Sequence, residues 1–357
     1  MTTQPTIKDV ARLAGVSIGT VDRVVHNRGK VSPKSRQAVQ NAIDVLGYRP
    51  SPIASALVRH RAPIRIGVCI PKVEREFWTE AIHGVTLARE KLLPFGVEVT
   101  EIDTDSYRFA DQQDSVRQLL DGGVSGLILV PLQGKSSDLD ALIPPEVPYA
   151  TVLEDAPDSR RLFHVGPDNY AMGRLAGQLA LLGAGSGMRC VILTSNGGFC
   201  GTQDRIRGFQ DYLAGRDTSA RILEVCECAL DSERIGYQSI YALAEAQMAK
   251  YPDMNVFYVT NGLTQWAAAA VKNHRMGGKI QVFGYERTEM TPTFLKEGII
   301  GAALCQEPAR QWYRAVMRMR EYLAGAPLPR CAVFRADCRI LLEESLPFQG
   351  LDELADL

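Results

Sequence analysis

The chain has 357 residues, of which 46% are hydrophobic and 23% charged, and this composition predicts a folded protein of two or three domains. Its longest apolar runs, such as 127–132, are strand-sized, and none reaches the roughly 20 residues that a membrane-spanning helix needs. The net charge of −1 conceals an asymmetry, because residues 1–61 carry ten Lys/Arg and three Asp/Glu and the remainder is acidic. A compact basic segment of this kind is typical of a module that binds a phosphate backbone.

The cysteines and histidines do not form the patterns typical of metal sites or disulfide frameworks. The eight cysteines lie mostly in apolar, strand-like runs and include no CxxC pair, which predicts buried, reduced thiols. The five histidines are scattered without metal-ligand spacing, so we expect no metal and no cofactor. The N-terminal segment has no charged region followed by a continuous apolar stretch, so we expect no secretory signal and a cytoplasmic location.

The first fifty residues have the pattern of three short helices. Apolar residues recur at helical spacing until Gly15, where the first helix is expected to end. Ser17 can cap a second helix, and a third begins at Pro33 and ends at Gly47. Two short helices joined at a glycine turn predict a helix-turn-helix. At 100° per residue, the face of the second helix that is opposite its valines carries a polar set: Gly19, Asp22, Arg23 and His26.

The stretch TIKDVARLAGVSIGTVDRVVHNRGKVSPKSRQAVQNAIDVLGYRPSPIASALVRHR resembles, from end to end, the DNA-binding headpiece of the LacI/GalR family of transcriptional regulators. The resemblance implies that Ile18 and Gly19 read bases in the major groove and that Arg23 contacts a base or a phosphate. It also implies a hinge helix that folds when DNA is bound and pushes Leu57 into the minor groove. The other implied DNA contacts, most of them to phosphates, are Thr6, Ser17, Thr20, Asn27, Ser32 and Ala54.

Several of these residues also have simpler roles. The hydroxyls of Ser17, Thr20 and Ser32 suit helix capping, and Leu57 could pack within the linker. Asp22 departs from the family pattern, because many relatives carry serine at this position. An acid there would repel the DNA phosphates. It could accept a hydrogen bond from a cytosine amino group, restrain Arg23, or pair with a histidine one turn along.

From Arg65 onwards, short apolar runs alternate with amphipathic segments of helix length. The runs are nearly continuous, as in parallel strands buried on both faces: IRIGVCI, FGVEVTEI, VSGLILV, VPYATVL, MRCVILT, MNVFYVT, KIQVFGY and GIIGAAL. Helical periodicity is found at 77–93, 109–121, 168–182, 203–214, 231–250 and 262–275. This βαβ pattern is too long for one sheet, and a Pro- and Asp-rich stretch near residue 160 indicates a crossing between two lobes.

This region resembles the periplasmic-binding-protein-like (type I) effector domain of the same family. The expected fold is therefore an all-α helix-turn-helix headpiece followed by a two-lobed α/β domain. The expected division is 1–50 for the headpiece, 51–62 for the hinge helix and linker, 63–345 for the effector domain and 346–357 for a C-terminal tail. The approximate lobes are 63–162 plus 291–325, and 163–290 plus 326–345.

Ligands of such sheets bind beyond the carboxyl ends of the strands, so the residues that follow each strand are candidate effector contacts. These candidates are Phe77, Trp78, Asp103, Gln133, Glu154, Arg205, Asn261, Glu286 and Gln306. Polar side chains with an aromatic face suit a hydroxyl-rich ligand. Two positions depart from the family, in which a carboxylate is common at Gly262 and an aspartate at Glu286. Asp103, Asp105 and Glu154 also fit exposed turn acids, and Trp266 could line the pocket or pack a lobe.

Two glycine clusters allow a nucleotide-binding interpretation that we reject. GAGSG at 183–187 precedes a strand, whereas a phosphate-binding turn follows one. GGFCG at 197–201 does follow a strand, but an effector domain explains the same loop. No Ser-His-Asp or Cys-His order is evident, so we do not expect an enzyme.

The sequence therefore predicts a DNA-binding transcriptional regulator, a repressor, whose operator binding is controlled by a small carbohydrate-like effector. We expect a homodimer on a pseudo-palindromic operator, since twofold protein symmetry requires one. The alternative is a cytoplasmic sugar-binding protein that does not regulate DNA.

Overall fold

The computed structural model describes residues 7–25, 31–46, 63–72, 75–104, 106–132, 136–185, 187–195, 199–216, 219–228, 236–329 and 331–348. The chain divides into a small N-terminal unit and a large unit that begins at Ile64. Within the described residues, no helix combines the length and the apolar character needed to cross a membrane.

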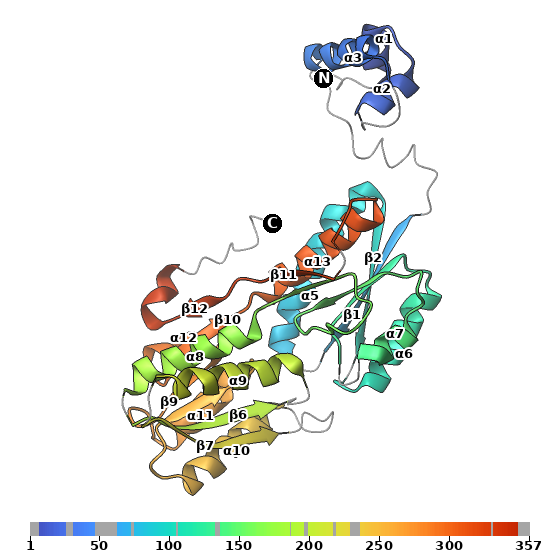
Figure 1. Cartoon of the computed structure of the whole chain (residues 1–357). Helices are drawn as coiled ribbons and strands as arrows, with labels where there is room; N and C mark the ends of the chain where they lie inside the picture. The colour runs from blue at the N-terminus through green and yellow to red at the C-terminus, as the bar shows by residue number, and fades with distance from the viewer. Residues whose placement is uncertain are drawn as a thin grey trace. The chain divides into compact units, whose positions relative to one another are not determined.

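The N-terminal unit is the predicted set of three helices, α1 (Ile7–Ala14), α2 (Ile18–Val25) and α3 (Pro33–Leu46) (Figure 1). Its core is a small cluster of valines and alanines that one face of each helix supplies. The turn between α1 and α2 needs Gly15, whose φ of 65° lies in the left-handed region. The hydroxyl of Ser17 accepts a hydrogen bond from the backbone N–H of Thr20 at 3.2 Å, and this caps α2.

The first lobe of the large unit contains a parallel six-stranded sheet in the order β11-β5-β4-β3-β1-β2. Its strands are β1 (Ile64–Pro71), β2 (Val97–Thr104), β3 (Gly126–Leu129), β4 (Tyr149–Val152), β5 (Phe163–Gly166) and β11 (Ala332–Arg335). Its helices are α5 (Arg75–Leu92), α6 (Phe109–Asp121), α7 (Ser136–Leu142) and α13 (Pro308–Leu323), with the short η1 (Leu93–Phe95) after α5. Side chains of α6 and α7 share one core cluster with β1, β3 and β4.

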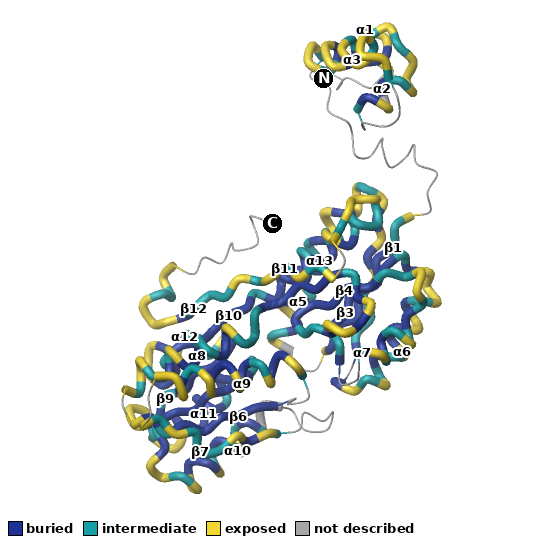
Figure 2. The backbone as a smooth tube through the Cα atoms, viewed as in Figure 1, coloured by how far each residue is buried: buried dark blue, intermediate teal, exposed yellow. Residues whose placement is uncertain are grey.

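The second lobe contains a six-stranded sheet in the order β12-β10-β9-β8-β6-β7, in which only β12 is antiparallel to its neighbour. Its strands are β6 (Arg189–Ser195), β7 (Arg221–Cys228), β8 (Val256–Val259), β9 (Gln281–Tyr285), β10 (Ile300–Cys305) and β12 (Arg339–Leu341). Its helices are α8 (Asn169–Ala184), α9 (Cys200–Ala214), α10 (Gly236–Lys250), α11 (Thr264–Asn273) and α12 (Thr291–Lys296), and η2 (Glu343–Phe348) follows β12. Buried residues run through both sheets (Figure 2).

The expected fold class is confirmed, and all eight predicted strand runs are strands, but the predicted lobe ranges are wrong at three strands. β5 and β11 belong to the first sheet, where β11 pairs in parallel with β5, and β10 belongs to the second. The chain therefore crosses between lobes after β5, after β10 and after β11. The strands β5, β7, β11 and β12 were not predicted, because a short or half-exposed strand carries little apolar signal.

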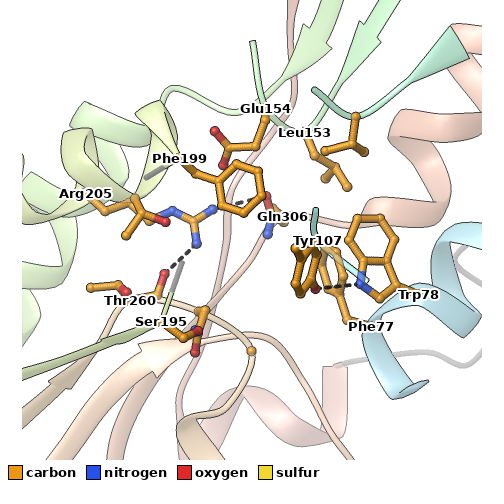
Figure 3. Close-up of a pocket in the computed structure, with 14 residues that line it drawn as sticks. Phe77, Trp78, Tyr107, Leu153, Glu154, Ser195, Phe199, Arg205, Thr260 and Gln306 are labelled. Atoms are coloured by element: carbon orange, nitrogen blue, oxygen red, sulfur yellow. Dashed lines mark hydrogen bonds between the residues drawn. The ribbon is translucent and has the colours of Figure 1, made fainter. Parts of the chain in front are cut away.

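Helices α8 and α9 lie side by side on one face of the second sheet (Figure 1). Their contact requires a glycine at position 208, because a Cβ atom there would stand 2.1 Å from the backbone oxygen of Tyr170. α9 is thereby held rigidly against α8, and its N-terminal residues face the space between the lobes (Figure 3).

The cysteines are free thiols, as predicted, but not all are buried. Cys228 and Cys338 are half-buried, and Cys200 and Cys331 are exposed, so the prediction of burial is wrong for these four. Cys200 begins a helix and Cys331 lies in a turn outside the core.

Candidate functional site

Fourteen described residues line one pocket between the two lobes (Figure 3). The first lobe contributes the start of α5 and the segments that follow β2, β3 and β4: Phe77, Trp78, Tyr107, Val130, Leu153 and Glu154. The second contributes the end of β6, the start of α9 and the segments after β8 and β10: Ser195, Phe199, Thr202, Arg205, Thr260, Asn261, Gly262 and Gln306. The pocket lies at the carboxyl ends of both sheets because parallel strands present their following loops at the same edge.

Aromatic side chains form one wall of the pocket. The indole Nε1 of Trp78 donates a hydrogen bond to the hydroxyl of Tyr107 at 2.9 Å, which satisfies the polar end of the indole and leaves its ring as an apolar surface. Phe77 packs edge-on against Trp78 with ring centroids 5.0 Å apart. Phe199 of the second lobe meets Tyr107 edge-on at 5.9 Å, so the aromatic wall crosses from one lobe to the other.

Arg205 stands on α9 and is held on several sides. Its Nε donates to Oδ1 of Asn169 at 2.8 Å, Nη1 to the backbone oxygen of Thr260 at 2.8 Å, and Nη2 to Oε1 of Gln306 at 3.2 Å. The guanidinium also lies 4.0 Å above the ring of Tyr285. With only 7% of its surface exposed, Arg205 is a fixed positive charge aimed into the pocket.

Glu154 connects the lobes. It belongs to the first lobe, and its Oε2 accepts a hydrogen bond of 2.9 Å from the backbone N–H of Gly201, in the first turn of α9 in the second lobe. A carboxylate at a helix N-terminus is stabilised by the unpaired N–H groups and by the helix dipole. Burial raises the pKa of Glu154 to about 7, although the Gly201 N–H and the charge of Arg205 lower it. A Cβ atom at Gly201 would stand 2.4 Å from Nδ2 of Asn169 and 2.5 Å from Oε1 of Glu154, so a larger residue there would displace both side chains.

The loop that carries Glu154 is fixed by a buried ion pair next to it. Nη2 of Arg161 donates to Oδ2 of Asp155 at 2.8 Å, and Arg161 is only 4% exposed. Oδ1 of Asp155 accepts from the backbone N–H of Ala156 at 2.7 Å. Burial lowers the pKa of His164 to about 4, so this neighbour of the pair is neutral near pH 7. Leu153, which directly precedes Glu154, has a φ of 68°, which is a strained conformation for a residue with a side chain.

The structure brings six of the nine predicted effector residues together in the pocket, namely Phe77, Trp78, Glu154, Arg205, Asn261 and Gln306. Gln133 lies outside the described residues. The other eight lining residues were not predicted as effector contacts: Tyr107, Val130, Leu153, Ser195, Phe199, Thr202, Thr260 and Gly262. Ser195 directly follows the predicted run MRCVILT and Thr260 is the last residue of MNVFYVT, so their place at the ends of predicted strands points to both. Tyr107 and Phe199 lie in loops whose path depends on the tertiary fold.

Two predicted residues, Asp103 and Glu286, do not line the pocket. Asp103 lies on β2, at the edge of the first sheet, and forms an ion pair with Lys72. Glu286 is 5% exposed and lies behind Gln306, whose Nε2 donates to Oε1 of Glu286 at 2.7 Å. Burial and the nearby Glu80 raise the pKa of Glu286 to about 8. The Gln306 side chain therefore stands between this carboxyl and the cavity.

In the N-terminal unit, the predicted base-reading residues stand at the exposed start of α2. Ile18 is 46% exposed although it is apolar, and Gly19 is exposed beside it. Nε of Arg23 donates to the backbone oxygen of Gly19 at 3.0 Å. Ser17 and Ser32 cap α2 and α3, as their simpler role requires, and each remains accessible. Thr6, Asn27, Ala54 and Leu57 lie outside the described residues, and so does the side chain of Asp22.

Comparison with known proteins agrees with both units. Residues 66–327 match the periplasmic binding protein domain family, and residues 6–51 match the family of bacterial regulatory proteins called lacI. The sequence is 24% identical to the ribose operon repressor of Bacillus subtilis over 79% of this chain and 81% of that repressor. It is 29% identical to the HTH-type transcriptional regulator DegA of Bacillus subtilis over 58% of this chain, a match that spans 60% of DegA.

Among solved structures, GanP, a glucose-galactose binding protein from Geobacillus stearothermophilus, aligns with a TM-score of 0.71 at 25% identity. The alignment covers 80% of this chain and 100% of GanP.

Proposed function

This chain belongs to the LacI/GalR family of DNA-binding transcriptional regulators, a family without enzymatic activity, and from that premise we propose that it is a repressor controlled by a small carbohydrate-like effector. The relatives named above include a ribose operon repressor and a glucose-galactose binding protein, which supports a sugar-like ligand.

The pocket is the observation that carries this proposal. Its cavity, about 620 Å³ when the open space at its mouth is included, is lined by residues of both lobes. Phe77 and Trp78 offer an aromatic face to a sugar ring, and Arg205 with Gln306 offers directional polar groups on the opposite side (Figure 3). A ligand held by both would bind the closed arrangement of the lobes more tightly than an open one.

The proposed mechanism couples that closure to DNA. An effector that contacts both lobes shifts their relative orientation and thereby orders or disorders residues 51–59, the predicted hinge segment. The effector thereby changes operator affinity by a coupling free energy. Operator binding changes effector affinity by the same amount. The regulator acts as a homodimer on a pseudo-palindromic operator, since each headpiece reads one half-site.

The test is selection of operator sequences from a randomised duplex library with the full chain, followed by gel-shift measurements at physiological salt. We expect a pseudo-palindromic sequence that outcompetes bulk DNA by well over tenfold. If no sequence exceeds bulk DNA by about tenfold, the chain is instead a sugar-binding protein that does not regulate DNA.

The same assay separates the roles of Asp22. Asp22→Ser binds all sequences more tightly if the acid only repels phosphate. If Asp22 reads a base, the variant loses its preference at one base pair of each half-site. An unchanged profile on both measures removes Asp22 from the DNA-reading face.

A further inference from the structure

Ion pairs join the three places at which the chain crosses between the lobes. The first crossing follows β5, the second follows β10, and the third lies between β11 and β12. Arg335, at the end of β11, forms an ion pair with Asp168 at the first crossing. Arg339, at the start of β12, forms an ion pair with Glu307 at the second, with 2.6 Å between Nη2 and Oε1. The third crossing is therefore tied to both of the others.

Each of the two acids stands next to a residue that holds Arg205. Asn169 follows Asp168, and its Oδ1 accepts a hydrogen bond from Nε of Arg205. Gln306 precedes Glu307, and its Oε1 accepts from Nη2 of Arg205 (Figure 3). Arg205 lies on α9 of the second lobe and lines the pocket. Its position in the pocket therefore depends on two of the crossing segments.

Glu307 is the more buried of the two acids, and it bridges the lobes. Its side chain is 15% exposed, against 40% for Asp168. Oε1 pairs with Arg339 of the second lobe, and Oε2 lies 3.3 Å from Nε of Arg310 on α13, in the first lobe. Exposed ion pairs contribute little because water screens them, whereas a partly buried pair is screened less. The cluster of Glu307, Arg310 and Arg339 is therefore the stronger connection, and we call it the hinge cluster.

The backbone at Glu307 is strained. Its φ of 52° and ψ of 66° lie in the left-handed region, which residues with a side chain seldom adopt. Such a conformation persists where the surrounding contacts determine it. Here Nε2 of Gln311, on α13, donates to the backbone oxygen of Gln306 at 2.6 Å, and two arginines flank the carboxylate of Glu307. These contacts set the direction in which the chain enters the first lobe.

The lobes contact each other across the pocket in this structure. Glu154 accepts from the N–H of Gly201, and Nε2 of Gln265 on α11 donates to Oε2 of Glu76 on α5 at 3.3 Å. The arrangement is therefore a closed one. Within the hinge cluster, one arginine is on a helix of the first lobe and the other is on a strand of the second. A rotation of the lobes about the crossings changes the distance between these two arginines, so Glu307 meets both in a narrow range of orientations.

Building on the proposed function, in which an effector closes the lobes, we propose that Glu307 is a positioning residue that, with Arg310 and Arg339, stabilises the closed arrangement before any effector binds. Glu307 is not among the described residues that line the pocket, so it acts through the orientation of the lobes. The hinge cluster thereby sets the fraction of the protein that is ready to bind effector. The apparent dissociation constant of an effector rises as that fraction falls.

The backbone N–H of Gly201 measures lobe closure without an effector. The first N–H groups of a helix have no partner within it, so this amide depends on Glu154 for protection from exchange. The test follows amide hydrogen exchange of the full chain by NMR. We expect exchange at Gly201 to be about five times faster or more in Glu307→Gln and in Arg339→Gln than in the wild type, because the rate follows the open population. Unchanged exchange at Gly201 in both variants overturns the proposal.

Arg189→Gln is the matched control. Arg189 is about as exposed as Arg339, 38% against 35%, and its Nε lies 2.8 Å from Oδ2 of Asp253 inside the second lobe. We expect exchange at Gly201 to equal that of the wild type in this variant. The buried Ile192 in β6 reports on unfolding of the whole lobe. An equal acceleration at its amide in the hinge variants would mean general destabilisation and would contradict a positioning role.

The double variant tests whether the two side chains act together. Because Glu307→Gln and Arg339→Gln remove the same ion pair, we expect the double variant to exchange at Gly201 no faster than the faster single variant. Effects that multiply would show that the two residues act independently, and this would contradict the proposal. Arg335→Gln removes the exposed pair, and we expect a smaller acceleration from it than from Arg339→Gln.

The operator assay keeps the two proposals apart, because hydrogen exchange needs neither operator nor effector. If exchange at Gly201 responds as expected but no operator is selected, the positioning role of Glu307 holds and the regulator proposal fails. If an operator is selected and exchange at Gly201 does not respond, the regulator proposal holds and the positioning role fails.

Discussion

Glu286→Gln is expected to remove a large part of the pH dependence of folding stability. The carboxyl is 5% exposed, accepts one hydrogen bond from Gln306, and has a pKa raised from its usual 4.5 to about 8. Because the folded state favours the neutral acid, this group contributes its full stability below pH 4.5, and that contribution is lost as the pH rises to about 8. At about 1.4 kcal/mol per pKa unit, the rise from 4.5 to about 8 corresponds to a loss on the order of 5 kcal/mol.

Glutamine keeps the size of the side chain and an oxygen that accepts from Gln306, but it cannot ionise. The assay is thermal unfolding of wild type and variant between pH 5 and pH 8, followed by circular dichroism. At 2–4 °C per kcal/mol for a domain of this size, we expect the wild type to lose roughly 10 °C more than the variant over this range. Glu146→Gln, at an exposed position, is the control and follows the wild type.

Parallel pH curves for wild type and Glu286→Gln would refute this reasoning. They would mean that Glu286 does not retain its proton in the folded protein, and that the carboxylate is stabilised by its surroundings rather than penalised by burial.

Two glycine substitutions test the contacts that place α9. Gly201→Ala puts a Cβ atom 2.5 Å from Oε1 of Glu154 and 2.4 Å from Nδ2 of Asn169, and we expect several-fold weaker effector binding and, from the loss of the Glu154 contact, a larger radius of gyration by small-angle scattering at saturating ligand. Gly215→Ala, near the other end of the helix with its nearest neighbour at 3.5 Å, is the control, and an equal effect of the two would contradict a cross-lobe contact. Gly208→Ala meets the backbone of Tyr170 at 2.1 Å, so we expect a destabilisation of about 3 kcal/mol or more in urea unfolding. A midpoint within error of the wild type would show that α8 and α9 can separate at little cost.

The pocket residues show which kinds of position a sequence reveals. Asn261 was predicted because it follows an apolar strand directly, and a parallel sheet places every such position at one edge, whereas Arg205 was predicted from its family-like spacing R-x-x-G-F. Asp103 and Glu286 satisfy the same rule and yet lie outside the pocket. Whether a strand-end side chain enters the cavity depends on what its neighbours leave open, and Gln306, which follows the next strand, β10, decides this for Glu286.

The sequence by itself determined the three helices of the N-terminal unit, the eight strongest strands and the family, because these depend on periodicity and spacing within a few tens of residues. Only the tertiary structure decided that β5 and β11 share the first sheet while β10 lies in the second, because strand pairing joins residues far apart in the chain. It also decided that Glu154 reaches Gly201 across the lobes. That contact exists because the loop after β4 and the first turn of α9 meet in space, and no local pattern in the sequence encodes such a meeting.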